Sequence, residues 1–280
     1  MKLSLPQKVI SDIVARALAE DLGIGDITTQ GIARAQDAMR GSISAQAAGV
    51  VAGIPLVCEV FRQLDAKVKV KPLVADGTKV NSGDELVRLA GPAAPILTGE
   101  RTALNFLGML SGMATVTNRY VEAVVGTDAK IFDTRKTPPG LRLLSKYAVA
   151  AGGGTNHRVG LFDAVLIKDN HIGLAGSVTQ AVSRMRAYDP KHLPVEVEAE
   201  TLPQVQEALD AQAEVILLDN MSLAQLREAV QLINHRAQVE VSGSVPLAEA
   251  RSIARLGVDR ISVGALTHSA PWLPMHLEWE

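Results

Sequence analysis

The second half of the chain alternates short β-rich apolar runs with amphipathic helical runs, at an interval of roughly 20–30 residues. The apolar runs, which we expect to be strands, cover residues 129–134, 162–168, 194–199, 214–218, 238–241 and 260–264. The helical runs cover residues 140–151, 178–188, 202–211, 223–234 and 247–256. Strands rich in Val, Ile and Leu with few polar interruptions are typical of a parallel sheet covered on both faces. This rhythm predicts an α/β fold with about six parallel strands, arranged as a barrel or as an open, doubly wound sheet.

Polar and small residues follow every predicted strand at its carboxyl end. In a (β/α) barrel these ends converge on one mouth, where active sites are built. In an open sheet the same residues would spread along a line and could not easily serve one small ligand, so their placement favours the barrel. The residues are Arg135 and Lys136, Lys168, Asp169 and Asn170, Glu198 and Glu200, Asp219 and Asn220, Ser242, Gly243 and Ser244, and Gly264, Ala265, Thr267 and His268.

Basic side chains are concentrated at two of these strand ends and in the loop that contains the sequence GGGTNHR. Several cations at one mouth would repel each other unless the ligand is an anion, and the Arg fork matches a carboxylate. His157 could act there as a base or as a donor to the ligand. The alternative is a set of solvated surface charges. The residues are Arg135, Lys136, His157, Arg158 and Lys168.

The last two strands end in small residues with free backbone amides, Ser242–Ser244 and Val263–Ala265. This place in a parallel barrel commonly holds a phosphate, and His268 lies close enough in sequence to reach one. The alternative is that the glycines only permit tight turns. Across the mouth, Glu198 and Asp219 provide oxygen ligands of the kind that Mg²⁺ prefers, although pairing with the nearby cations explains them equally well.

The first half of the chain shows a different pattern. Apolar residues at helical spacing predict a helix over residues 5–19, and a loop containing Gly and Asp follows at 21–29. Further helices are expected near 55–64 and over 96–125, with turn-punctuated antiparallel β structure at 74–86. That β segment also resembles the turns of lipoyl and biotinyl carrier modules. Because Lys79 lies in an ordinary Gly-flanked turn, we favour a small β-rich scaffold instead.

Composition limits the possible partners of this 280-residue chain. Its 28 basic and 30 acidic residues give a net charge of −2, without the basic excess that general nucleic-acid or membrane-surface binding needs. A single Cys excludes an intramolecular disulfide and fits a reducing compartment. The polar, Pro-containing N-terminus does not resemble a signal peptide, and the most apolar run, residues 47–58, is too short to span a bilayer. We therefore expect a cytoplasmic protein that binds neither nucleic acid nor membranes.

Several motifs resemble those of the quinolinate phosphoribosyltransferase family, also called carboxylating nicotinate-nucleotide pyrophosphorylases. The most specific are DTRKT at 133–137, GGGTNHR at 152–158 and LIKDNHI at 166–172. Weaker matches are EDLGIGDITT at 20–29 and GERTALNFL at 99–107, and others reach the last strand, so the resemblance covers nearly the whole chain. The chain differs from a sister group tied to molybdenum transport at the segments that match the three specific motifs.

The resemblance implies two domains and a reaction. We place an N-terminal α/β sandwich domain at 1–109 and an open (β/α) barrel of about six to seven parallel strands at 110–270, and we expect the tail at 271–280 to return to the N-terminal domain. The implied reaction transfers phosphoribose from phosphoribosyl pyrophosphate to quinolinate and releases nicotinate mononucleotide, pyrophosphate and CO₂, as a step of de novo NAD biosynthesis. Mg²⁺ is the implied cofactor. A homodimer or larger assembly, possibly a hexamer, is also implied, with Arg101 donated across the subunit interface.

The resemblance also implies roles for the residues at the barrel mouth. Lys136, Lys168, Glu198 and Asp219 are the expected catalytic residues, and Glu198 and Asp219 the expected metal ligands. The expected substrate-binding residues are Arg101, Arg135, His157, Arg158, Ser242, Gly243, Ser244, Gly264, Ala265 and His268. Ser244 departs from the Asn or Gly that often follows Ser-Gly in this family, but it keeps a hydroxyl donor. Two other hypotheses are a Schiff-base aldolase or lyase that uses Lys168 and a non-catalytic anion-binding protein.

Overall fold

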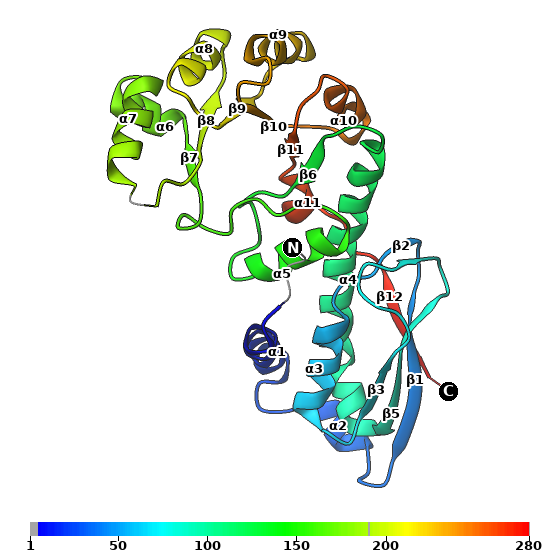
Figure 1. Ribbon diagram of the computed structural model, residues 1–280. Helices are drawn as coiled ribbons and strands as arrows, with labels where there is room; N and C mark the ends of the chain where they lie inside the picture. The colour runs from blue at the N-terminus through cyan, green and yellow to red at the C-terminus, as the bar shows by residue number, and fades with distance from the viewer. Residues whose placement is uncertain (1–4, 190, 280) are drawn as a thin grey trace. The chain divides into compact units, whose positions relative to one another are not determined.

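The structure is a computed structural model that describes residues 5–189 and 191–279, and the chain divides into two compact units (Figure 1). The first unit contains the residues up to Asn118, the segment Pro138–Gly153 and the tail from Ser269. The second unit contains Arg119–Thr137 and Gly154–His268. This division differs from the boundary expected near residue 109, because the helix α4 (Ala93–Ala123) continues through it. No helix in the described part of the chain is both long and apolar enough to cross a membrane.

The first unit is built on a four-stranded antiparallel sheet in the order β12-β1-β5-β3. These strands are β1 (Ala38–Ala45), β3 (Lys69–Pro72), β5 (Glu85–Pro92) and β12 (Met275–Trp279), so the C-terminal tail pairs with β1. A two-stranded sheet joins β2 (Gly49–Val50) to β4 (Lys79–Val80), and its register pairs Lys79 with Val50. Lys79 is therefore part of a paired strand and not of a hairpin tip, which removes the support for a carrier module.

Helices α1 (Gln7–Leu22), α3 (Ile54–Leu64), α4 and α5 (Arg142–Ala151) contribute apolar faces to the core of the first unit. The sequence pattern identified α5 as a helix but placed it in the barrel. Its residues Leu144 and Ala148 are fully buried in the core of the first unit instead. The loop expected at 21–29 also contains the start of a short helix, α2 (Ile27–Ile32), because the Asp26 carboxylate accepts a hydrogen bond from the Thr29 amide at 2.9 Å and caps it.

The second unit contains a six-stranded parallel sheet in the order β6-β11-β10-β9-β8-β7. Its strands are β6 (Lys130–Phe132), β7 (Val165–Ile167), β8 (Val195–Ala199), β9 (Val215–Asp219), β10 (Gln238–Ser242) and β11 (Arg260–Ser262). The strands follow the chain from β7 to β11, and the first strand lies beside the last. That is the strand order of a barrel opened between β6 and β7, whereas a doubly wound sheet would reverse direction in the middle. The predicted open (β/α) barrel is confirmed.

The helices α7 (Val178–Tyr188), α8 (Leu202–Asp210), α9 (Leu223–Ile233) and α10 (Leu247–Ala254) lie outside these strands (Figure 1). Two short helices follow strand ends, α6 (Asp169–Ala175) and α11 (Ala265–His268). We expected Asp169 and Asn170 at the carboxyl end of the second strand, and they form the first turn of α6 there. The ring Nδ1 of His171 accepts a hydrogen bond from the Lys168 amide at 2.9 Å and so closes this turn.

The two faces of the parallel sheet differ in polarity. The register pairs Glu198 with Leu217, Leu217 with Glu240 and Glu240 with Arg260, and paired residues on neighbouring strands point to the same face. The intervening residues of β8, β9, β10 and β11 point to the opposite face and are buried and apolar, and they are Val195, Val197, Ala199, Ile216, Leu218, Val239, Val241 and Ile261. The interior face of the barrel is therefore charged, and only the helix-covered face is apolar throughout.

Candidate active site

A cavity of about 180 Å³ lies at the carboxyl ends of the parallel strands. It brings together six of the residues expected at the mouth, namely Arg135, Lys136, His157, Arg158, Lys168 and Ser242. Thr134, Leu166, Leu217, Glu240 and Ser262 complete its lining. Residues far apart in sequence therefore meet in one small space, as convergence of the strand ends requires.

The Arg side chains in this cavity lie close enough to influence each other. Burial lowers the pKa of Arg158, and the nearby positive charge of Arg135 lowers it further. Repulsion between two guanidinium groups is a cost that an anionic ligand would remove. The arrangement therefore favours an anion in the cavity.

Lys168 and Glu198 form an ion pair on neighbouring strand ends. The Lys168 Nζ donates to Glu198 Oε2, and the Glu198 side chain is only 8% exposed whereas that of Lys168 is 44% exposed. The two side chains form an ion pair in which the carboxylate faces the Lys168 ammonium group. The contact supports a charge-bearing role for Lys168. Glu198 is therefore ion-paired, which is the alternative to metal binding that the sequence analysis kept open for this residue.

The segment before Arg158 is held against β6 by backbone and side-chain bonds. Thr155 forms a parallel bridge with Phe132, which extends the sheet at its open edge. The Asp133 carboxylate accepts one hydrogen bond from Asn156 Nδ2 at 2.6 Å and another from the His157 amide at 2.9 Å. Asp133 is fully buried, so these charge-assisted bonds fix the loop firmly. These contacts hold the segments DTRKT and GGGTNHR next to each other.

Both ring nitrogens of His157 are engaged by the chain itself. Nδ1 accepts a hydrogen bond from the Arg158 amide at 2.8 Å. Nε2 lies 3.3 Å from Glu196 Oε2 and 3.3 Å from Glu240 Oε1. The imidazole therefore points into the barrel interior, between β8 and β10, as well as lining the cavity.

The pKa values of the buried groups in this cluster are shifted by burial and by their contacts with one another. Burial lowers the pKa of His157, but hydrogen bonding to Glu196 and Glu240 outweighs burial and raises the pKa to about 9. A proton on Nδ1 would, however, place two donors 2.8 Å apart, because the Arg158 amide already donates there. The Arg158 amide and the two carboxylates thus hold the ring from both sides, and burial raises the pKa of Glu196.

The same three residues, His157, Glu196 and Glu240, offer ligand atoms within 4.8 Å of one another, a spacing that can also hold a metal ion. The chain itself supplies the positive partners, however. Ser262 Oγ donates to Glu240 Oε1 at 2.6 Å, and Arg260 Nη1 lies 3.7 Å from Glu240 Oε2. These contacts hold one oxygen of each carboxylate, whereas Glu196 Oε1 and Glu240 Oε2 are buried without a hydrogen-bond partner among the described residues, and we do not assign a metal to the cluster.

Glu196 and Glu240 were not among the residues expected from the sequence. The signal was present as strict alternation, in VEVEA at 195–199 and QVEVS at 238–242. A period of two with acidic residues on one face indicates a polar interior face, whereas the overall Val content suggested two apolar faces. Because these strands are rich in Val overall, we overlooked the acidic residues at their alternate, inward-facing positions.

The predicted phosphate residues form two close-packed turns. Gly243 has φ +114°, and a Cβ there would lie 2.5 Å from Asn220 Oδ1, so only glycine fits. A Cβ on Gly264 would lie 3.0 Å from Lys136 Cδ and 3.1 Å from His268 Nε2. Gly264 therefore lies between these two side chains, and Thr267 Oγ1 fixes the turn by donating to the Lys136 carbonyl at 2.6 Å. Ser244 is exposed and Ala265 begins α11, and neither these two residues nor Gly243, Gly264 and His268 line the cavity.

Glu198, Asp219 and Arg101 also lie outside the cavity lining. Asp219 pairs in register with Ser242, and its Oδ2 accepts a hydrogen bond from Asn220 Nδ2 at 2.7 Å. Arg101 belongs to the first unit, where it is exposed on α4.

The fold and this cavity define a (β/α)-barrel enzyme whose site is built for small anions. Comparison with known proteins identifies the family within this class. The sequence profile of the quinolinate phosphoribosyl transferase C-terminal domain matches residues 113–278, and that of the N-terminal domain matches residues 26–111. The chain belongs to the quinolinate phosphoribosyltransferase family, and it is a decarboxylating enzyme of that class within NAD biosynthesis.

Similar proteins share both sequence and structure along the whole chain. It is 43% identical over 276 residues to the probable nicotinate-nucleotide pyrophosphorylase [carboxylating] of Synechocystis, covering 98% of this chain and 93% of the relative. It is 45% identical over 273 residues to the Mycobacterium leprae protein of that type, covering 95% and 96%. The solved nicotinate-nucleotide pyrophosphorylase from Francisella tularensis superposes with a TM-score of 0.94 at 38% identity, covering 100% of this chain and 99% of the other. The Ehrlichia chaffeensis structure gives a TM-score of 0.94 at 41% identity, covering 100% of both.

Proposed function

We propose that the cavity at the barrel mouth is where phosphoribose passes from phosphoribosyl pyrophosphate to the ring nitrogen of quinolinate. The observation that carries this proposal is the convergence of Arg135, Lys136, Arg158 and Lys168 in one space of about 180 Å³. Quinolinate is a dianion and phosphoribosyl pyrophosphate carries more negative charge still, so several cations are needed to hold the two together. The products are nicotinate mononucleotide, pyrophosphate and CO₂.

The substrate carboxylates are assigned to the two Arg side chains. Arg135 and Arg158 are adjacent, and each can form a forked pair with a carboxylate. An anion between them would relieve the repulsion from Arg135 that, after burial, lowers the pKa of Arg158. This placement holds the ring nitrogen of quinolinate in the cavity, next to the residues that hold the ribose donor.

The phosphoribosyl donor is assigned to the opposite edge of the cavity. Ser242 ends β10 and Gly243 follows it, and Gly264 lies next to Lys136 and His268, so backbone amides, a hydroxyl and the Lys136 ammonium are available to hold the 5′-phosphate. As the bond from ribose C1 to pyrophosphate breaks, Lys136 and Lys168 stabilise the negative charge of the leaving group. Glu198, bonded to Lys168, provides negative charge for the cationic ribose. Decarboxylation follows as the bond from ring C2 to its carboxylate breaks; the cationic pyridine nitrogen stabilises the electron pair left on C2, and a proton from water takes the place of CO₂ there.

We assign Mg²⁺ to Glu198 and Asp219. Glu198 Oε2 is bonded to Lys168 and Asp219 Oδ2 to Asn220, so each carboxylate keeps one oxygen for a cation, which fits an ion that takes few protein ligands. Bound there with the donor, the ion would neutralise charge on the pyrophosphate. Asp219→Asn is expected to raise the Mg²⁺ concentration for half-maximal activity about tenfold. The matched change Asp210→Asn on the exposed end of α8 should leave it unchanged. An unchanged requirement in both variants would place the metal elsewhere.

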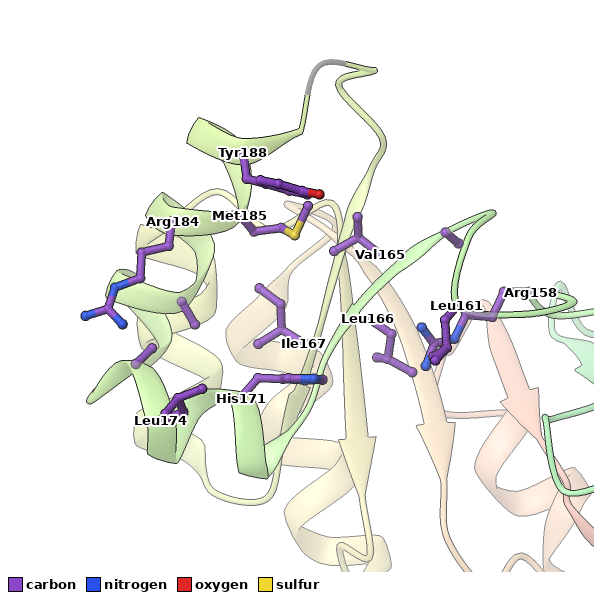
Figure 2. A pocket seen from close by; sticks show the side chains of 13 residues that line it. Arg158, Leu161, Val165, Leu166, Ile167, His171, Leu174, Arg184, Met185 and Tyr188 are labelled. Carbon is purple, nitrogen blue, oxygen red and sulfur yellow. The ribbon is translucent and has the colours of Figure 1, made fainter.

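We also propose a cytoplasmic homodimer in which Arg101 enters the site of the neighbouring subunit. Exposed apolar surface supports self-association. A groove of about 480 Å³ lies between β7 and helices α6 and α7, where Figure 2 shows Ile167, His171, Met185 and Tyr188 around it. Leu174 and Tyr188 at its rim are 85% and 82% exposed.

Mixed dimers test the shared site. Arg101→Ala and Arg158→Ala subunits should each be nearly inactive alone, because each lacks a cation for the substrate. Mixed dimers of the two should regain about a quarter to a half of the wild-type activity, since one site per dimer receives both Arg side chains. Lack of any recovery in isolated mixed dimers would contradict donation of Arg101.

The reaction itself is tested by release of pyrophosphate from phosphoribosyl pyrophosphate. Release should depend on quinolinate and be accompanied by CO₂ and nicotinate mononucleotide. Trapping with borohydride and keto substrates should give no adduct at Lys168. A protein that binds both anions without releasing pyrophosphate would contradict the proposal.

A further inference from the structure

We infer that Glu240 is a positioning residue for quinolinate binding, because it holds the His157 ring and the ring in turn holds Arg158. The inference rests on the proposed role of Arg158 in binding a substrate carboxylate. It adds a residue that neither the motifs nor the cations of the mouth identify. The connection runs from Ser262 to Glu240, from Glu240 to His157, and from His157 Nδ1 to the Arg158 amide.

The first step is the fixed position of the Glu240 carboxylate. Glu240 is fully buried in the middle of β10, with Leu217 and Arg260 as its partners in register on the neighbouring strands. Its Oε1 accepts a hydrogen bond from Ser262 Oγ at 2.6 Å, and Arg260 Nη1 lies 3.7 Å from its Oε2. A carboxylate held from β11 on a rigid sheet is a firm acceptor for a group that comes from a loop.

The second step is the orientation of the imidazole. His157 enters the barrel between β8 and β10, with Nε2 at 3.3 Å from carboxylate oxygens on both strands. The ring also lies edge-on to Phe132, with centroids 6.1 Å apart. With Nε2 directed at Glu240 and Glu196, Nδ1 must face back toward its own backbone. There it accepts the Arg158 amide at 2.8 Å.

The third step is the effect on Arg158. The backbone of Arg158 receives its direction from that hydrogen bond, while Asp133 holds the His157 amide just before it. Beyond Arg158 the Val159 and Gly160 amides are capped by Asp163, at 2.7 and 2.9 Å. The Arg158 side chain lines the mouth cavity and also the groove of Figure 2, so a change in its backbone angle would carry the guanidinium from one space toward the other.

A direct contact between Glu240 and quinolinate is the competing explanation, since Glu240 also lines the cavity. The charges oppose it, because a carboxylate next to a dianion is repulsive. The two explanations predict opposite signs. If Glu240 acts only as a nearby negative charge, Glu240→Gln should lower the KM for quinolinate. If it positions Arg158, the same change should raise that KM.

The test measures quinolinate and phosphoribosyl pyrophosphate kinetics for wild type, Glu240→Gln, Arg158→Ala and the double variant. Glu240→Gln keeps the size of the side chain and an acceptor for Ser262, and it should raise the KM for quinolinate about tenfold. The KM for phosphoribosyl pyrophosphate should change less than about twofold. In the Arg158→Ala background Glu240→Gln should have no further effect on quinolinate, because its influence passes through Arg158. Glu249→Gln, on the exposed surface of α10, is the matched control and should behave as wild type.

Folding is checked by thermal unfolding of each variant. If Glu240→Gln does not fold, Ser262→Ala removes only the hydroxyl that holds Glu240 and should raise the quinolinate KM about threefold, again only when Arg158 is present. An unchanged or lower KM in the folded variant, or equal effects with and without Arg158, would overturn the inference. If Arg158→Ala itself leaves quinolinate kinetics unchanged, the proposed role of Arg158 fails and the inference fails with it. A defect in Arg158→Ala without one in Glu240→Gln rejects the inference alone.

Discussion

The hydrophobic core of the first unit is apolar, although the unit also buries Glu59 and Lys146, whereas the parallel sheet of the second unit buries charge on its interior face. The core of the first unit includes Phe61, Leu107 and Leu110, all fully buried among other hydrophobic residues. The second unit buries Glu196 and Glu240 at the same depth, with His157 between them. An apolar core tolerates side chains of similar volume, but a buried charge demands a particular partner in a particular place. The second unit is thus specified by polar contacts, at the place where we propose that substrates bind.

The largest expected effect tests the first half of this comparison. Phe61→Ala should reduce the free energy of unfolding by about 3–5 kcal/mol, because it leaves a cavity in a core that the protein cannot fill. The measurement is urea unfolding followed by circular dichroism. Phe162→Ala removes a ring of the same size that is 75% exposed, and it should cost less than about 0.5 kcal/mol. Equal losses in the two variants would show that the first unit does not depend on apolar packing in this way.

This contrast also explains what the sequence could predict. Hydrophobic period identified nearly every long helix and every parallel strand, and the helix expected at 178–188 has the bounds of α7. The spacing of apolar residues in α5 predicted a buried helix face, but it did not show whether that face packs in the core of the first or of the second unit. Helices α2 and α6 were missed because six or seven residues give too short a period, and each depends on a single capping side chain.

The sequence predicted those residues of the candidate site that lie at or just after the carboxyl end of a parallel strand. Lys136, Lys168 and Ser242 followed from that rule, whereas Glu240 lies inside a strand and required the alternation of VEVEA and QVEVS to be recognised. The pairing of Lys168 with Glu198 could not be predicted, because neighbouring strand ends fix which residues are adjacent but not which of two partners a carboxylate takes. The structure brings these residues together, but the roles assigned to all of the site residues stay predictions, including those of Arg101, Asp219 and Ala265.

An intermediate effect tests the second half of the comparison. Arg158→Ala should weaken quinolinate binding by about 2–4 kcal/mol, or about 30- to 700-fold, because it leaves a substrate carboxylate unpaired next to Arg135. The expected stability change is small by contrast, since Arg158 is partly exposed at the mouth. Steady-state kinetics and isothermal titration with quinolinate measure the loss. Arg227→Ala on the exposed face of α9 is the matched control. If Arg158→Ala reduces the free energy of unfolding by more than the free energy of quinolinate binding, the polar contacts of the second unit serve stability as the apolar core of the first unit does.

The smallest effect concerns a buried carboxylate that belongs to the first unit. Glu59 is only 3% exposed, and hydrogen bonds from Arg62, Gln63 and Gln7 hold it on α3. The hydrogen bond from Arg62 is the main cause that lowers the pKa of Glu59 from 4.5 to about 2, although burial acts in the opposite direction. Because the Arg62 side chain is 60% exposed, water screens the pair, and we expect Glu59→Gln to cost about 1–2 kcal/mol at pH 7.

The sign of the pH dependence follows from the lowered pKa of Glu59. A carboxyl that ionises more readily in the folded state contributes its full stability above the unfolded pKa of 4.5 and loses it as the pH falls toward about 2. Urea unfolding at several pH values should therefore show wild type and Glu59→Gln converging between about pH 4.5 and 2, while Glu228→Gln on the exposed side of α9 stays parallel to wild type. Enzyme kinetics at pH 7 should be the same for all three proteins. A changed quinolinate KM in Glu59→Gln would mean that buried charge in the first unit also serves the site, as Glu240 does in the second.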